Sequence, residues 1–466
     1  MKLTYNVEDK VSFGKLIVFA IQQLLAIMAA TLTVPVVIGH GMKPEAALFG
    51  AGVGTLVYVL FTKRKSPVFL GSSFAFLDSL AAAFTGAVTL ELGYLGLIMG
   101  AVFAGLVYVV IALIVKKFGV DWVNKLMPAV IIGPTVSIIG LSLAGNAISD
   151  LNKGNVVKMI SDTESVQLAS PLITILCGLV ALFVTFLCSA YGKKTLRLIP
   201  FVIGILAGYA VALCFTLIGN ATGADALKVL NFDSFTALVT DENGAKGVFL
   251  STFLTVPEFT FMRAIGGFKD LTAGYVATVA VAYVPVAFVV FAEHIADHKN
   301  ISSIIEKDLL KDPGLDRTLL GDGVGSIAGA FFGGCPNTTY GESIGCVAIT
   351  KNASVVTIIA AAIGAILISF VSPFVAFVNS IPSCVMGGVC MALYGFIAVS
   401  GLKMLKEVDL GDDKNLFVVS TILIAGIGGL KLHFGKITIT SIACALILGI
   451  LVNLVLSKAK ATDKNE

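Results

Sequence analysis

Long apolar runs that carry almost no charge dominate this chain, and they restrict its fold more than any other feature. A helix that crosses the hydrocarbon core of a bilayer needs roughly 20 mostly apolar residues. Of the 466 residues, 57% are hydrophobic and only 13% are charged, whereas about 25% of a soluble domain is charged. The excess is larger than one buried core explains, so we predict an all-α polytopic membrane protein.

The charge-poor runs provide about fourteen candidate transmembrane segments. Two of them, 318–334 and 337–350, are shorter and richer in glycine than an ordinary spanning helix. An even number of segments places both ends of the chain on the same side of the membrane. The candidates cover residues 16–38, 46–62, 68–88, 93–115, 126–148, 169–190, 198–218, 271–294, 318–334, 337–350, 353–374, 381–402, 415–430 and 437–457.

The distribution of Lys and Arg predicts the orientation, because cytoplasmic loops carry an excess of basic residues. With the N-terminus inside, 23 of the 32 basic residues fall on the cytoplasmic side and 9 on the outer side. The polar N-terminus leads into the first apolar run without a small-residue cleavage site, so we expect the first span to direct insertion. We therefore expect a protein of the cell inner (cytoplasmic) membrane with both termini in the cytoplasm.

Several other classes of function lack support in the sequence. The basic residues are spread among loops and do not form the patch that a nucleic-acid partner requires, so no nucleic acid is expected. The eight cysteines lie in apolar segments without CxxC spacing, which predicts neither a metal site nor a cofactor. We find no nucleophile and base set and no His-rich spacing, so we expect no catalytic residues and no enzyme.

Two acidic residues stand out against this apolar background. Glu293 ends the apolar run 273–292, and Glu342 follows a Pro and several Gly in GGCPNTTYGESIG. A carboxylate at bilayer depth is costly, so it usually lines a bundle interior or a water-filled cavity and marks a substrate or ion path. The pattern is typical of a transporter.

A polar stretch at 219–270 divides the chain into two halves of about seven segments each, 1–218 and 271–466. We assign this stretch to an outer loop. In the first half, a span with Gln23 precedes the interrupted segment SPVFLGSSFAF by about fifty residues; in the second, a span with Glu293 precedes GGCPNTTYGESIG by a similar distance. Paired interrupted segments of this kind indicate an inverted-repeat transporter with its binding site at the interruptions.

Four motifs make a family resemblance specific. They are LGSSFAF at 70–76, AEH at 292–294, EKDLLKDPGL at 306–315 and PNTTYGESIGCVAITK at 336–351. In this order and spacing they resemble the nucleobase/ascorbate transporter (nucleobase-cation symporter-2) family, in its bacterial uracil permease branch. The resemblance extends over roughly residues 13–455, except for a longer loop at about 220–260.

The resemblance implies a fold of fourteen segments in two inverted repeats of seven. It further implies a core domain, at about 13–115 and 271–374, and a gate domain, at about 126–218 and 381–457. In this family, segments 3 and 10 each contain a short extended stretch followed by a half-helix, and the substrate lies between them. The family's substrate contacts match Phe74, Glu293, Gly341 and Glu342 here, with Tyr340 expected to line the same site.

The chemistry of uracil suits these residue types. The base is a flat, neutral ring that has two N–H donors and two carbonyl acceptors. Ionised Glu293 and Glu342 accept hydrogen bonds from the ring N–H groups, and backbone N–H groups near Phe74 and Gly341 donate to the ring carbonyls. Two nearby carboxylates repel each other, so protonation of one couples transport to protons. Asp297 lies one helical turn after Glu293 and is the third candidate for proton coupling.

We therefore predict a proton-coupled uracil permease, a uracil:H+ symporter that acts by alternating access. A permease for xanthine, another purine or another pyrimidine is the alternative within the family. An anion channel or transporter on the same architecture is the alternative from another class, although two carboxylates at the broken helices disfavour a passive anion path. The expected partners are uracil, a proton and the lipid bilayer. Whether the chain acts singly or as a homodimer is left open.

Three positions depart from the family pattern. Ser343 stands where Asn is usual, Gln23 stands where His is common, and Asp297 stands where uracil permeases often have His. Asp78 is a further acid in the third segment, to which the family assigns no role. The glycines of GDGVGSIAG at 321–329 lack the strand and acidic residue of a dinucleotide loop, and they favour close packing of helices.

Each candidate residue also has a structural interpretation. The alternatives that a structure must separate are a helix-end carboxylate for Glu293, a cap of a half-helix for Glu342, a loop charge beside Lys299 for Asp297 and ordinary core packing for Phe74.

Overall fold

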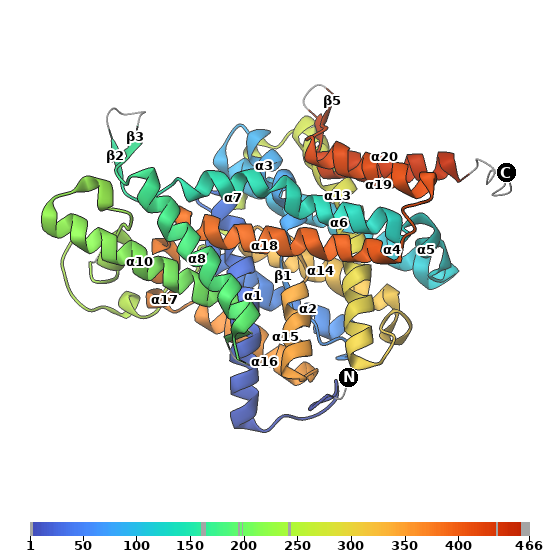
Figure 1. Ribbon diagram of the computed structural model, residues 1–466, viewed down its shortest axis with the longest axis horizontal. Coiled ribbons are helices and arrows are strands. Elements are labelled where there is room, and N and C mark those ends of the chain that lie inside the picture. Colours follow the sequence, from blue (N-terminus) through green and yellow to red (C-terminus); the bar gives the residue numbers. More distant parts are fainter. Residues whose placement is uncertain are drawn as a thin grey trace.

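The computed structural model describes residues 3–159, 165–193, 196–197, 199–240, 244–434 and 437–457. Most of these residues are helical (Figure 1). Helices of the first half are α1 Phe13–Ile38, α2 Pro44–Phe61, α3 Leu77–Thr85, α4 Leu90–Phe118, α5 Asp121–Leu126, α6 Ala129–Ser142, α7 Ala144–Leu151, α8 Pro171–Tyr191 and α10 Pro200–Thr222. Those that follow are α11 Asp233–Leu238, α12 Thr260–Ala264, α13 Ala273–Ile305, α14 Leu315–Gly333, α15 Gly341–Thr350, α16 Val355–Ile368, α17 Ser372–Ser380, α18 Ser383–Met404, α19 Asp413–Ile427 and α20 Ser441–Leu456.

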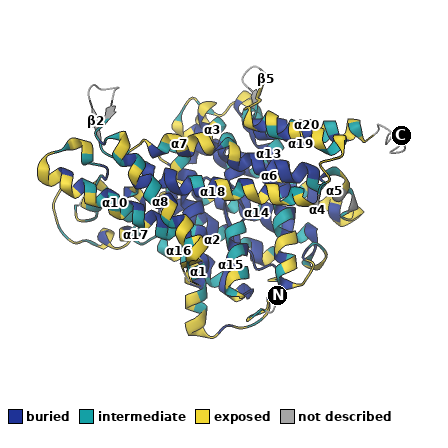
Figure 2. Ribbon diagram, viewed as in Figure 1, coloured by how far each residue is buried: buried dark blue, intermediate teal, exposed yellow. Residues whose placement is uncertain are grey.

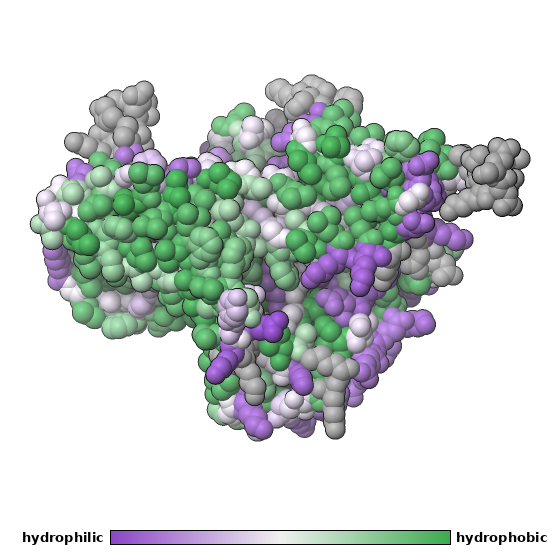
Figure 3. Space-filling view, viewed as in Figure 1, coloured by the Kyte–Doolittle hydropathy of each residue, from purple (hydrophilic) through white to green (hydrophobic). Residues whose placement is uncertain are grey.

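The prediction of an all-helical membrane protein is confirmed. Within the described residues, eight helical stretches are long and apolar enough to cross a bilayer, and three shorter apolar helices accompany them. Hydrophobic side chains cover the molecular surface over α8 and α10, and again over α19 and α20 (Figure 3). Many side chains on the outer faces of these helices are exposed, whereas the centre of the molecule is buried (Figure 2). A surface of this kind suits lipid and not water.

Two short strands interrupt the helices at the centre. β1 (Leu70–Ser72) and β4 (Asn337–Thr339) pair antiparallel, with Gly71 opposite Thr338. Both extended stretches predicted for the third and tenth segments are therefore present. Each strand leads into a helix: β1 into a 3₁₀ turn at Phe74–Phe76 and α3, and β4 into α15. The other strand pairs, β2 (Val157–Met159) with β3 (Ser165–Gln167) and β5 (Leu432–Phe434) with β6 (Ile437–Ile439), are peripheral hairpins.

The larger helix contacts fall into two groups. In one group, α14 packs against α2 and α4, α16 against α1 and α2, and α13 against α3 and α4. In the other, α18 packs against α6, α7 and α8, α10 against α8, and α19 against α6 and α20. Smaller contacts of α13 with α6 and α20, and of α1 with α10 and α18, join the groups. The β1–β4 pair belongs to the first group and lies beside this junction.

Glycines let α14 approach its neighbours at backbone distance. A Cβ atom placed on Gly50 of α2 would collide with the carbonyl oxygen of Gly329, and one on Gly54 would lie 2.6 Å from that of Gly325. Gly323 packs in the same way against α4. Small residues that bring helix backbones together are typical of membrane interiors. The glycine motif therefore serves helix packing, as predicted.

The 318–334 run is one continuous helix, α14, which is not among the eight stretches that are long and apolar enough to span, in line with its predicted glycine-rich character. Two other segments differ from their predicted form. The helix that carries Glu293 continues to Ile305, because polar side chains beyond the apolar run are buried against other helices and not in lipid. The 126–148 segment is divided into α6 and α7 at Leu143.

The 219–270 stretch folds back onto the helices. Phe259 and Phe261 form an aromatic cluster with Phe49 of α2 and Phe332 of α14. Burial raises the pKa of Glu258, but a 2.5 Å hydrogen bond and the positive charge of Arg263 outweigh it and hold the pKa below its usual range.

Candidate binding site

A small pocket of about 60 Å³ lies where β4, α15, α13 and α18 meet. All five predicted substrate residues and all three predicted proton-coupling residues line it. The lining residues are Phe74, Val136, Glu293, Ala296, Asp297, Thr338, Thr339, Tyr340, Gly341, Glu342, Phe396, Ile397, Ser400 and Met404.

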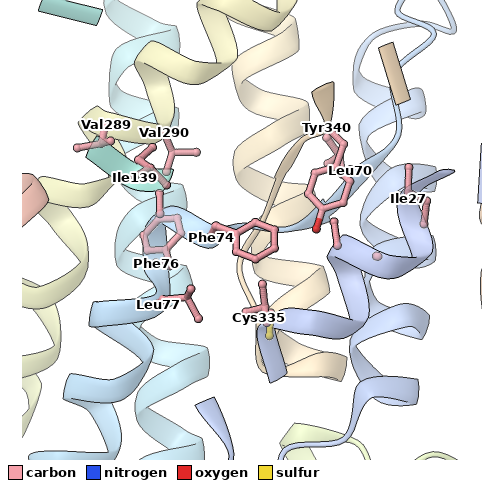
Figure 4. Close-up of a cluster of buried hydrophobic side chains, with 14 of the residues drawn as sticks. Ile27, Leu70, Phe74, Phe76, Leu77, Ile139, Val289, Val290, Cys335 and Tyr340 are labelled. Carbon is pink, nitrogen blue, oxygen red and sulfur yellow. The ribbon is translucent and has the colours of Figure 1, made fainter. Parts of the chain in front are cut away.

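The crossing of β1 and β4 positions the aromatic residues. Phe74 is buried at the end of the extended stretch. Its ring makes an edge-to-face contact with the Tyr394 ring of α18, with the two ring centroids 5.6 Å apart. Figure 4 shows Phe74 between Tyr340 and Leu70 on one side and Phe76 and Ile139 on the other. The Tyr340 hydroxyl donates to the Ser72 carbonyl at 2.7 Å, which ties β4 to β1.

The carboxylates come from two different elements. Glu293 and Asp297 are half-buried on α13, and because they are four residues apart they share one face of that helix. The Asp297 carboxylate accepts a hydrogen bond of 2.7 Å from the Thr339 hydroxyl. Asp297 is therefore part of the pocket, and the interpretation as a solvated loop charge is wrong.

The third carboxylate belongs to the first turn of α15. Tyr340 is the N-cap residue, Gly341 begins the helix, and half-buried Glu342 follows. The N-terminal turn of a helix leaves backbone N–H groups unpaired and carries a partial positive charge. A Cβ atom on Gly341 would meet nothing within 4 Å, so the backbone is open at this point. The helix end can thus present N–H donors to a ligand.

Two departures from the family pattern contact each other. The Ser343 hydroxyl accepts a 3.0 Å hydrogen bond from the backbone N–H of Phe69, just before β1, and a short one from the Gln23 side-chain amide. One serine therefore connects α1, the β1 segment and α15. A Gln and Ser pair fills the positions at which the family commonly has His and Asn.

The charged side chains that line the pocket are all acidic. Three carboxyl side chains and no Lys or Arg line the pocket. Since ionised carboxylates only accept hydrogen bonds, the pocket suits a ligand that donates N–H groups, and it opposes an anion. Within the described residues, no cluster of His, Cys, Asp or Glu has the arrangement of a metal site.

The sequence interpretation missed several polar neighbours. Thr338 lines the pocket with a buried hydroxyl that has no partner among the described residues, and Thr339 holds Asp297. Both are visible in the sequence as adjacent threonines in an apolar segment. Ser400 of α18 carries no comparable signal.

Asp78 lies outside this pocket. It lines a second cavity of about 190 Å³, which Phe74 also borders, and its carboxylate is 3.9 Å from the Lys431 ammonium group. Phe74 therefore separates two cavities.

Comparison with known proteins assigns the family. A family model described as "Permease family" matches residues 14–435. A uracil permease of Bacillus subtilis is 36% identical over 98% of this chain and 96% of its own length. A uracil permease of Escherichia coli K12 is 35% identical over 97% of this chain and 93% of its own. The chain belongs to the nucleobase/ascorbate transporter family. It is a multi-pass membrane transporter and not an enzyme.

Solved structures of the same fold come from anion transporters. The transmembrane domain of the cyanobacterium bicarbonate transporter BicA superposes with a TM-score of 0.58 at 13% identity, covering 96% of this chain and all of that domain. Murine Slc26a9, an anion transporter in the inward-facing state, superposes with a TM-score of 0.61 at 10% sequence identity. The match covers 98% of this chain and 70% of the Slc26a9 chain. At such low identity, the likeness describes the fold alone.

Replacement of Ser343 by Ala tests the link between the two broken segments. The change leaves the Phe69 N–H and the Gln23 amide without their acceptor, which costs roughly 1 to 3 kcal/mol per buried group. We expect a lower melting temperature of the purified permease in detergent and weaker nucleobase binding. Ser137→Ala is the matched control, since that hydroxyl donates only to the Gly133 carbonyl of its own helix. Equal melting temperatures for the two variants would contradict the role.

Proposed function

We propose that this permease imports uracil together with a proton across the cytoplasmic membrane. The observation that carries the proposal is the meeting of three carboxyl groups, an aromatic ring and a helix N-terminus in one pocket. Each group matches one part of the ligand: acceptors for its N–H groups, donors for its carbonyls and a ring for its flat face. The identity to bacterial uracil permeases supports the same substrate.

Uracil would bind with one edge toward the carboxylates. Glu293 and Glu342 accept from the ring N–H groups, and the free N–H groups at the start of α15 donate to a ring carbonyl. Phe74 provides the aromatic contact, and Tyr340 closes the side of the pocket. The unpartnered Thr338 hydroxyl offers a further donor or acceptor to the ring.

Transport follows from relative movement of two domains. We infer fourteen segments in two inverted repeats, with a core domain at about 13–115 and 271–374 and a gate domain at about 126–218 and 381–457. The two groups of helix contacts agree with this division. The pocket lies at their junction, because α13, α15 and β4 meet α18 there. Both termini are assigned to the cytoplasm.

Coupling to protons follows from the carboxyl groups. Ionised carboxylates close together in a low-dielectric site repel each other. A proton bound on one of Glu293, Asp297 and Glu342 relieves this repulsion, and the nucleobase N–H groups satisfy the remaining acceptors. An inward proton gradient therefore favours loading from outside and release inside.

A permease for xanthine or another nucleobase is the second candidate. Any lactam base offers the same N–H and carbonyl edge, so the carboxylates alone do not select uracil. An anion transporter on this fold is disfavoured by the acidic lining.

Uptake of labelled uracil by cells without their own nucleobase carriers tests the proposed function. We expect uptake that rises with an inward proton gradient, collapses with a protonophore, ignores sodium and is competed by unlabelled uracil more strongly than by xanthine. Stronger competition by xanthine would assign the purine, and dependence on external sodium would exclude proton coupling.

Glu342→Gln tests the carboxylate on α15. The amide replaces one acceptor by a donor at the ring edge, so we expect a loss of uracil affinity of about 100-fold, as for an unpaired buried polar contact. The measurement is uracil binding by calorimetry on purified protein. Glu91→Gln, which changes an exposed acid at the start of α4, is the control. Wild-type affinity in Glu342→Gln would remove this residue from the site.

Asp297→Asn tests proton coupling separately from binding. The amide oxygen can still accept from Thr339, so pocket geometry is kept while the titratable group is lost. We expect the rate of uptake to become less dependent on pH, with a smaller effect on the affinity for uracil. Asp233→Asn, an exposed acid of the outer loop, should change neither quantity. An unaltered pH profile would return Asp297 to a purely structural role.

A further inference from the structure

A second set of titratable side chains lies on another face of α13. Glu293 and Asp297 line the pocket, whereas the residues that directly follow them, His294 and His298, contact α14 and α2. Both imidazole rings are completely buried. The proposed transport chemistry uses neither of them.

Hydrogen bonds from each histidine, together with the stacking of the two rings, join a set of buried side chains that we call the histidine network. It consists of Asp322, His294, His298, Tyr58 and Ser66, all with 0% exposure. The His294 Nδ1 atom lies 2.7 Å from Asp322, and its Nε2 atom lies 3.0 Å from the Thr318 hydroxyl. The two imidazole rings stack at 4.0 Å. The His298 Nε2 atom lies 2.7 Å from the Tyr58 hydroxyl, which lies 2.7 Å from Ser66.

The tautomer of His298 follows from its partners. Its Nδ1 atom lies 2.8 Å from the backbone carbonyl of His294, and a carbonyl only accepts, so Nδ1 carries a hydrogen. In neutral His298, Nε2 accepts from Tyr58, which in turn accepts from Ser66. In charged His298, Nε2–H donates to Tyr58, which donates to Ser66. One added proton thus reverses two hydrogen bonds without moving a heavy atom.

The network has room for one additional positive charge. Two stacked imidazolium rings would repel each other strongly in a low-dielectric interior. Asp322 pairs with His294, whose ring stacks on that of His298, so the network contains one carboxylate to balance one imidazolium. The other carboxylate oxygen of Asp322 is buried without a partner among the described residues. The remaining titratable neighbours are Tyr108 of α4, whose ring contacts His294, and the pocket acids Glu293, Asp297 and Glu342.

The far end of the network, Ser66, is itself fully buried but lies next in sequence to a partly exposed charged side chain. Ser66 directly follows Lys65, whose ammonium group pairs with the exposed Asp312 at 2.6 Å. The orientation assigned from basic residues places this end, with Lys63 and Arg64, in the cytoplasm. A proton that leaves Ser66 therefore leaves on the side to which uracil is delivered.

Resting on the proposed proton-coupled function, we propose that the histidine network holds the transported proton and releases it through Tyr58 and Ser66. A proton on His298 Nε2 favours ionised carboxylates on the pocket face of α13, and these accept the nucleobase N–H groups. On release, Tyr58 takes the proton from Nε2 and passes its own to Ser66, which in turn passes its own proton to a water molecule that enters beside Lys65. Hydrogen bonds then return to the neutral direction, and one proton has moved.

Tyr58→Phe tests this path. The change removes the only hydroxyl between His298 and Ser66 and leaves the pocket untouched. The readouts are two measurements on purified permease in proteoliposomes: uracil accumulation driven by a pH gradient, and uracil counterflow at equal pH. We expect accumulation to fall toward the level reached without a gradient and to lose its dependence on internal pH. Counterflow needs no net proton movement and should be retained.

Two further variants complete the design. Ser66→Ala should act in the same direction as Tyr58→Phe. Tyr283→Phe is the matched control, since it removes a buried hydroxyl of α13 that has no hydrogen-bond partner in the described structure, and it should behave as wild type.

The outcomes separate the two proposals. Accumulation in Tyr58→Phe equal to wild type overturns the network as a proton path. Equal losses of accumulation and counterflow in both Tyr58→Phe and Ser66→Ala also overturn it, and identify a structural polar network. A wild-type permease that shows uracil counterflow but no response to a pH gradient refutes the proposed proton coupling itself.

Discussion

The antiparallel pairing of β1 with β4 is the interaction on which the rest of the site depends. Backbone groups at membrane depth have no water to bond with, so extended chain survives there only when it is buried in protein. Here the backbone N–H and C=O groups of the two strands hydrogen-bond to each other. Side chains add to the pairing: the Thr55 hydroxyl bonds to the backbone N–H and C=O of Leu70, and the Asn337 amide donates to the Gly50 carbonyl. The pairing allows α3 and α15 to begin inside the helix assembly, where the N-terminal N–H groups of α15 face the pocket.

Close helix packing is the condition for this pairing. Asn337 occupies the space that a side chain on Gly329 or Gly54 would need. The glycines of α2 and α14 thus allow the two helices to contact each other and also leave space for the Asn337 side chain of β4. A transporter that moves its binding site needs such a rigid unit, because loosely held strands would lose their hydrogen bonds in an apolar surrounding.

Much of the fold could be predicted from hydropathy, because lipid exposure imposes apolar runs of a definite length. The interrupted segments and the pocket acids were also predictable, since Gly, Pro and carboxylates are conspicuous in an apolar background, whereas the extended form of the interruptions came from the family resemblance. Contacts between distant segments were not. Nothing in the sequence pairs Gln23 with Ser343, which are 320 positions apart, or Tyr58 with His298. The end of α13 was misplaced because hydropathy treats polar side chains such as His294 as solvent-facing, whereas protein groups satisfy them.

The placement of α13 explains how one helix serves two chemical environments. Successive residues of an α-helix are rotated by about 100°, so Glu293 and Asp297 share one face, while His294 and His298 share another. The first face lines the pocket at the junction of the two helix groups, and the second face hydrogen-bonds to partners on α2 and α14. A charge on either face acts on the other across one helix diameter, with little water to screen it. In the proposed coupling, binding and protonation are linked through the electrostatics of a single helix, and the link itself requires no large rearrangement.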